Sequence, residues 1–176
     1  MRKLILIFIT SFCFACTNNQ GVMVTFDDEK SNLIRAHYQN YLSNDIEGLK
    51  SLWSPDLKIY MNNVESAGVD DIVSLITAQH ENFSDISMSF QDDEGGVDLG
   101  IWVQTITYPA NNGYPETTMT QTWFTWNATG KTSGNNLQVP AHIGFQWGDG
   151  RIVKEWHNFD PSSMMAELEL ASAQSE

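Results

Sequence analysis

The spacing of hydrophobic residues changes in character along the chain. In its first half the apolar positions recur three and four residues apart, which is typical of amphipathic helices. This spacing predicts helices at about 28–43, 46–53 and 69–83, and Asp45 is a candidate N-cap for the second helix. Between the second and third helices we expect a turn at 54–56 and a short strand at 57–61.

After the helices, apolar and polar residues alternate, as they do in half-buried strands. The predicted strands are 86–90, 97–108, 117–127, 137–147 and 151–159. The last two are joined by Gly148-Asp149-Gly150, a tight hairpin signal that fixes their register. Helices followed by an antiparallel meander indicate an α+β fold, with the helices covering one face of a curved sheet. A last helix is predicted from residue 162 to about 170. We place the end of the domain at about residue 165 and expect residues 166–176, apart from any continuation of this helix, to form a disordered tail.

The N-terminus has the pattern of an export signal. Arg2 and Lys3 precede an apolar run at 4–14, which is too short to span a bilayer. The sequence Cys-Phe-Ala-Cys at 13–16 resembles the bacterial lipobox, whose last cysteine is lipidated. We therefore expect a lipoprotein signal peptide at 1–16, lipidation at Cys16, a tether at 17–27 and a location in the bacterial cell envelope. The alternative is an ordinary secretory signal that is cut nearby.

Charge narrows the possible partners. The chain has 22 Asp and Glu against 9 Lys and Arg, a net charge of −13. Such a surface repels phosphate backbones, so nucleic-acid binding is disfavoured. It also repels anionic lipids, so we expect membrane association through a lipid anchor only. With Cys16 lipidated, the domain after it carries no thiol for a disulfide or a zinc site.

The strand predicted at 137–147 has the clearest sidedness. Its apolar residues all occupy odd positions: Leu137, Val139, Ala141, Ile143, Phe145 and Trp147. Because side chains alternate between the two faces of a sheet, the odd face is expected to pack under the helices. His142 then faces solvent or a partner subunit.

Two stretches of sequence resemble a known superfamily. Asp45-Ile-Glu-Gly-Leu49 with Trp53-Ser-Pro-Asp56 resembles the opening of nuclear transport factor 2-like proteins. The segment 145–160 resembles their SnoaL-like, polyketide-cyclase-like branch. The resemblance spans about 28–165 and implies a cone, in which a curved mixed sheet, mainly antiparallel, carries three N-terminal helices on its concave face around one pocket. It implies no cofactor, and it leaves function open, because the superfamily includes both enzymes and inert binding modules.

The hairpin register of this family implies which face of strand 151–159 lines the cone. The implied inner face consists of Val153, Glu155, His157 and Phe159. The implied outer face consists of Ile152, Lys154 and Trp156.

Four side chains then form a candidate acid–base set. Glu155 holds or deprotonates His157, His157 acts as base, and His37 or Tyr41 donates a hydrogen bond to an oxyanion. The alternative is structural: Glu155 and His157 are solvated on an edge strand, and His37 is a core histidine.

Two other chemistries are disfavoured. His157 and Asp160 together do not make a metal ligand set, so we predict no metal. In the ketosteroid-isomerase branch the carboxylate base falls at or beside Met61 and the oxyanion Asp near Ile143. Neither residue here is acidic, which argues against steroid-type isomerisation.

The remaining aromatic residues have two possible roles, in the wall of the pocket or in packing within the core or at a subunit interface. The expected ligand contacts are Tyr41, Met61, Trp123, Ile143, Phe145 and Phe159. Packing in the core or at a dimer interface is the alternative role for these aromatics. The threonines at 117, 118, 120, 122 and 125 suit a half-exposed face and a homodimer formed through the sheet.

Three functions remain open at this stage. The first is an envelope-anchored domain that binds a small apolar or hydroxylated molecule. The second is a cofactor-independent acid–base enzyme of the cyclase, isomerase, dehydratase or hydrolase type, using the same pocket. The third is a structural dimerisation module.

Overall fold

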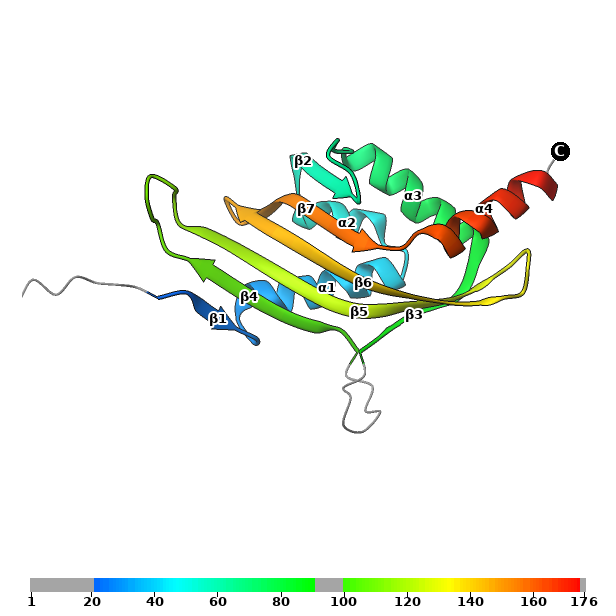
Figure 1. Ribbon diagram of the computed structural model, residues 1–176, viewed down its shortest axis with the longest axis horizontal. Helices are drawn as coiled ribbons and strands as arrows, with labels where there is room; N and C mark the ends of the chain where they lie inside the picture. Colours follow the sequence, from blue (N-terminus) through cyan, green and yellow to red (C-terminus); the bar gives the residue numbers. More distant parts are fainter. Residues whose placement is uncertain (1–20, 91–99, 175–176) are drawn as a thin grey trace, which may run out of the picture.

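The computed structural model, which describes residues 21–90 and 100–174, has the predicted α+β architecture (Figure 1). The helices are α1 (Glu29–Leu42), α2 (Ile46–Leu52), α3 (Val69–Asn82) and α4 (Ser162–Gln174). The strands are β1 (Met23–Thr25), β2 (Trp53–Met61), β3 (Phe83–Ser89), β4 (Trp102–Tyr108), β5 (Thr117–Gly130), β6 (Asn136–Gly148) and β7 (Arg151–Phe159).

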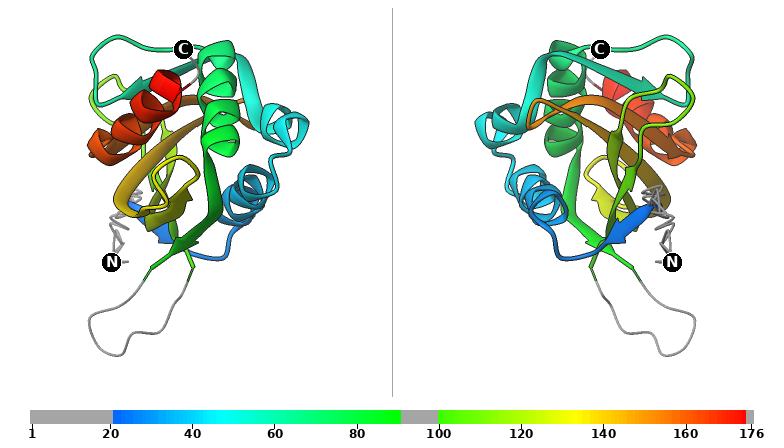
Figure 2. Two further views of the ribbon diagram at one scale, coloured as in Figure 1. Left: turned by 90° about the vertical axis from the view of Figure 1, so that its right-hand side faces the viewer. Right: turned by 90° about the vertical axis from the view of Figure 1, so that its left-hand side faces the viewer.

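The strands form one open, mixed sheet of seven strands in the order β1-β4-β5-β6-β7-β2, with β3 also paired to β5. β4 pairs with residues 117–123 of β5, and β3 pairs with residues 125–130. All pairs are antiparallel except β2 with β7, which is parallel. Figures 1 and 2 show the sheet curving around α1, α2 and α3, with α4 beside α3. This is the expected cone.

Helices α1 and α2 begin where the sequence supplies capping side chains. Asp28 accepts hydrogen bonds from the backbone N–H groups of Lys30 and Ser31, at 2.9 and 3.1 Å. Asp45 accepts one from Gly48 N at 2.9 Å, as predicted for an N-cap. Asn44, in the left-handed region with φ 57°, turns the chain between α1 and α2.

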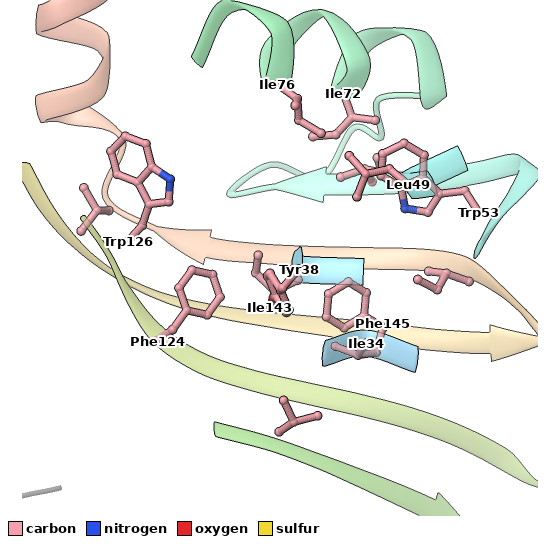
Figure 3. Packing of buried hydrophobic residues seen from close by; sticks show 14 of the residues in the cluster. Ile34, Tyr38, Leu49, Trp53, Ile72, Ile76, Phe124, Trp126, Ile143 and Phe145 are labelled. Carbon is pink, nitrogen blue, oxygen red and sulfur yellow. The ribbon is translucent and has the colours of Figure 1, made fainter. Parts of the chain in front are cut away.

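The core lies between the helices and the concave face of the sheet (Figure 3). Ile34 and Tyr38 of α1 and Ile72 and Ile76 of α3 point toward the sheet. The odd face of β6 is turned inward, as predicted, while His142 lies on the opposite face. The helical layer therefore packs on the concave face of the sheet, to which β6 contributes one unbroken apolar side.

A chain of buried hydrogen bonds joins the sheet to the start of α1. The Trp147 indole N–H donates to the Thr120 hydroxyl at 2.8 Å, and Thr120 is 2.8 Å from Thr105. Thr105 is 2.8 Å from Ser31, whose hydroxyl donates to Asp28 at 2.7 Å. An indole can only donate and a carboxylate can only accept, so every hydroxyl along this chain donates toward Asp28.

Helix α4 is held by a buried carboxylate. Glu167 accepts hydrogen bonds from the backbone N–H groups of Thr132 and Ser133, at 2.7 and 3.1 Å. A Cβ on Gly130 would overlap the same carboxylate, so glycine is needed for this close approach. Met164, one turn earlier, is also buried.

Three boundaries differ from the prediction. Residues 54–56 belong to β2, because a register shift between Trp53 and Lys58 lets the strand carry Pro55 without a ladder hydrogen bond. Residues 23–25 of the expected tether form β1, which is too short to show a period. Residues 166–174 of the expected tail continue α4, because Met164 and Glu167 anchor that helix.

The predicted leader, Cys16 and residues 17–20 lie outside the described residues. Within the described ranges, none of the helices has both the length and the apolar character needed to cross a membrane.

Candidate functional site

A largely apolar cavity of about 100 Å³ lies inside the cone. Its walls come from α1, α2, α3, the inner faces of β5 to β7, and Met164 of α4. Seven of the predicted site residues line it, namely His37, Tyr41, Ile143, Phe145, Glu155, His157 and Phe159. Most of the site residues predicted from the sequence therefore line the same cavity.

Glu155 is the buried polar centre of this cavity. It lies opposite Phe145 in the β6–β7 ladder and is 2% exposed. Trp53 Nε1 donates to its Oε1 at 2.7 Å, and His157 Nε2 donates to its Oε2 at 2.7 Å. Burial alone would raise the pKa of Glu155, but the hydrogen bonds from His157 and Trp53 and the nearby imidazoles lower it below its ordinary value. The site holds an ionised carboxylate.

His37 faces this carboxylate region from α1. Its ring centroid lies 5.4 Å from that of Trp53 and 6.3 Å from that of Phe145. Burial lowers the pKa of His37 to about 4, against the opposing effect of the Glu155 charge, so the ring is neutral near pH 7. Within the described ranges, its Nδ1 is the one buried side-chain nitrogen or oxygen without a hydrogen-bond partner.

Tyr41 is held in the wall rather than free to act. Its hydroxyl donates to Gln79 Oε1 at 2.9 Å and accepts from Trp126 Nε1 at 2.8 Å. Burial raises the pKa of Tyr41 well above its ordinary value. The Gln79 amide nitrogen donates a weak hydrogen bond to the Met164 sulfur at 3.7 Å. At this wall a ligand would meet the Tyr41 hydroxyl, whose hydrogen bonds are already made within the protein, and the Gln79 amide, whose nitrogen is only weakly hydrogen-bonded.

Titratable groups are few around the cavity. Among the lining residues that the structure describes, Glu155 is the single carboxylate, and there is no Lys or Arg. In the same described ranges, no group of three or more His, Cys, Asp or Glu side chains is placed to hold a metal ion.

The predicted faces of β7 need one correction. Ile152 pairs with Trp147 while Lys154 pairs with Gln146, so β7 carries one extra residue, Val153, at a β-bulge. The bulge shifts the alternation by one position before Glu155. Ile152, fully buried, therefore occupies the inner position that Val153 was expected to take.

Two predicted ligand contacts lie elsewhere. Trp123 is on the outer face of β5, where its ring stacks on His142 with centroids 4.7 Å apart. Met61, at the end of β2, packs against the core without lining the cavity. Thr120 and Thr122, expected on the half-exposed face, are fully buried, because Trp147 and Tyr38 satisfy their hydroxyls at 2.8 and 2.7 Å.

Sequence reasoning missed the role of Trp53 and Gln79. The sequence singles out Trp53 only as the end of the predicted helix 46–53 and as part of the stretch that resembles the superfamily, and its contact with Glu155 spans 102 positions. Gln79 lies on the inward stripe of α3 beside Ile72 and Ile76, so its position in the helical repeat was an available signal.

Comparison with known proteins identifies the fold. No protein-family model matches the sequence, and no curated protein matches it either. Solved structures do. AclR of Streptomyces galilaeus, a proposed hydroxylase, has a TM-score of 0.58 at 16% identity over 80% of this chain and 96% of its own. The chain has the nuclear transport factor 2-like fold.

Other matches with this fold are in line with the predicted SnoaL-like branch. IdmH of Streptomyces antibioticus, a proposed polyketide cyclase, has a TM-score of 0.55 at 17% identity over 81% of this chain and 99% of its own. A nuclear transport factor 2-like protein of unknown function from Burkholderia pseudomallei has a TM-score of 0.52 at 13% identity over 78% and 95%. At such identities the likeness concerns the fold, and chemistry has to be argued from the site.

Proposed function

We propose that this domain binds a small, largely apolar molecule inside its cone, with Glu155, His157 and His37 at the polar end of the site. The observation that carries the proposal is the buried Glu155 carboxylate, held by Trp53 and His157 at the wall of an apolar cavity. Burying a charge costs free energy that apolar packing does not. A group kept there against that cost indicates a role beyond filling the core.

A fragment titration tests this proposal. Small neutral probes of three or four carbon atoms, such as acetone, 2-propanol and 2-butanone, added to the folded protein, should shift amide NMR signals around Ile143 and Phe145. Val139→Phe should fill the cavity and remove these shifts, while Gln138→Phe, on the outer face of the same strand, should leave them. The absence of any specific shift, together with no co-purified small molecule in native mass spectrometry, would contradict the proposal.

A second candidate function is acid–base catalysis in the same cavity. It is favoured by the hydrogen bond between His157 Nε2 and Glu155, which fixes the imidazole and would stabilise the imidazolium formed when His157 takes a proton. His37, neutral and partly unpaired, would accept or donate a hydrogen bond to the substrate. A turnover that His157→Ala, Glu155→Gln and His37→Ala abolish while binding persists would establish this function.

We also propose that the protein is a lipoprotein of the bacterial envelope. The support is the signal pattern at 1–16, followed by a described domain whose first strand starts at Met23. Mass spectrometry of protein expressed in a bacterial host should find acyl chains on an N-terminal Cys16. Cys16→Ala should abolish acylation and membrane retention. An unmodified N-terminus at another residue would support simple secretion instead.

Finally, we propose a homodimer formed through the outer face of the sheet. The outward positions of β5 and β6 carry Trp123 and His142 but no Asp or Glu, although the chain is strongly acidic. Two such faces can meet without charge repulsion. Light scattering after gel filtration should give twice the monomer mass, and Trp123→Asp should give the monomer. If the tests above find neither a ligand nor a turnover, the remaining proposal is that the domain is a structural dimerisation module.

A further inference from the structure

The buried carboxylate of Glu155 has no permanently charged partner among the described residues that line the cavity. Glu155 is ionised, and the described lining residues include no Lys or Arg. Of the two imidazoles beside it, His37 is neutral near pH 7. The other, His157, contacts Glu155 at 2.7 Å through a single nitrogen, so the site has room for a permanently charged cation from elsewhere.

The rest of the lining suits a cation more than other ligands. Seven Phe, Tyr and Trp side chains surround the space, and aromatic ring faces attract cations. They are Tyr38, Tyr41, Trp53, Phe124, Trp126, Phe145 and Phe159. An anion would be repelled by Glu155 at low dielectric. A neutral molecule would bind but would leave the buried carboxylate uncompensated.

We infer that the cavity takes a small organic cation, a methylated ammonium group that pairs with Glu155 among the aromatic rings. This inference rests on the proposed binding function and names its ligand class. The cavity is about 100 Å³. Because an apolar cavity of about 150 Å³ holds benzene, the ligand group has only a few carbon atoms around the charge. An alkylated ammonium also loses less hydration on burial than a bare one.

The existing contacts of Glu155 are compatible with this ligand. Each of its oxygens accepts one hydrogen bond, from Trp53 or from His157, and a carboxylate has about four acceptor positions. Trp53 and His157 therefore orient the carboxylate while the cation approaches from the cavity. The two side chains act as positioning residues.

The test compares three probes of similar shape and different charge: tetramethylammonium, tert-butanol and pivalate. Calorimetric or NMR titration at constant ionic strength, with sodium chloride as the salt control, measures each Kd. Tetramethylammonium should bind at least tenfold more tightly than tert-butanol, and pivalate should not bind. Glu155→Gln should remove this preference, while Glu169→Gln, exposed on α4, should keep it.

The outcomes separate this inference from the function on which it rests. Equal binding of tert-butanol and tetramethylammonium overturns the inference and leaves the binding function standing. Absence of binding by all three probes, together with the neutral fragments named above, overturns both. If Glu155→Gln fails to fold, Phe145→Leu decides: it should weaken tetramethylammonium more than tert-butanol, and equal weakening contradicts the inference.

Discussion

Trp53 donates its indole N–H to Glu155 Oε1 over 2.7 Å, and this contact ties the helical half of the chain to its last strand. The parallel pairing of β2 with β7 makes it possible, since it sets Trp53 opposite Ile152. The orientation of the buried carboxylate therefore depends on both halves of the domain. A substitution at Trp53 should therefore alter both the orientation of the Glu155 carboxylate and the free energy of unfolding.

Trp53→Phe should test this dependence. Phenylalanine keeps a ring in place but removes the donor, so Glu155 retains a single hydrogen bond from a side chain. The free energy of unfolding in urea should fall by about 1–3 kcal/mol at pH 7. Trp123→Phe, on the outer face, should cost clearly less, at about 0.5 kcal/mol. Equal losses for the two variants would contradict the structural importance of this hydrogen bond.

Trp53→Phe should also change how the free energy of unfolding depends on pH in the acidic range. The pKa of Glu155 is lower in the folded state than in an unfolded chain. Its contribution is therefore present above the unfolded pKa and is lost as pH falls through the folded pKa. Removing the Trp53 donor should raise the folded pKa, so Trp53→Phe should lose less stability on acidification than the parent protein does. A steeper loss would contradict this prediction.

His37 should give a separate pH dependence. Burial lowers its folded pKa to about 4, below the ordinary value of 6.5 for a free histidine. Between those two values the unfolded state binds a proton that the folded state does not, so stability should fall as pH falls from 6.5 to 4. The loss attributable to His37 amounts to about 3 kcal/mol. His37→Met should remove it, which the difference between the two urea stability curves measures. Parallel curves would contradict the low folded pKa.

Glu167 should control the docking of α4. Glu167→Ala leaves the backbone N–H groups of Thr132 and Ser133 without their acceptor, and should cost about 2 kcal/mol. Hydrogen exchange in 162–174 should accelerate. Gly130→Ala should have a similar effect, because its methyl group would occupy the space of the carboxylate. Glu169→Ala, exposed on the same helix, is the control, and an equal effect there would refute the assignment.

The buried hydroxyl chain can be cut at its centre. Thr105→Val keeps the shape of the side chain but can neither accept from Thr120 nor donate to Ser31. We expect a loss of about 1–3 kcal/mol, seen as a lower urea midpoint with an unchanged m-value. Thr107→Val is the matched control, since its hydroxyl lies half-buried on the same strand. An equal or larger loss of stability for Thr107→Val would show that the buried hydrogen-bonded hydroxyls add little to the free energy of unfolding.

The sequence predicted the parts of the fold that local periodicity determines. α1, α2 and α3 begin and end within about two residues of their predicted bounds, because their apolar residues recur at helical spacing and Asp45 marks the start of α2. The inner face of β6 was correct because its alternation is unbroken. β1 and the end of α4 were missed because short or weakly periodic segments depend on partners far away in sequence.

The candidate site was predicted less completely. Glu155 and His157 were correctly placed on the inner face, although Val153 was not, because a β-bulge leaves no mark in an alternating pattern. Trp123 was assigned to the wrong face because buried Thr120 and Thr122 look like surface residues until their partners are known. The Trp53 contact is non-local, so no window of sequence contains both of its ends.

The position of β7 between β6 and β2 has a consequence for biosynthesis. Until residues 151–159 leave the ribosome, β2 has no strand to join, and Glu155 cannot meet Trp53. The newly made chain therefore cannot complete its core until β7 has been made. Late closure of this kind leaves the apolar positions of β2 without their partner strand through most of the synthesis of the domain.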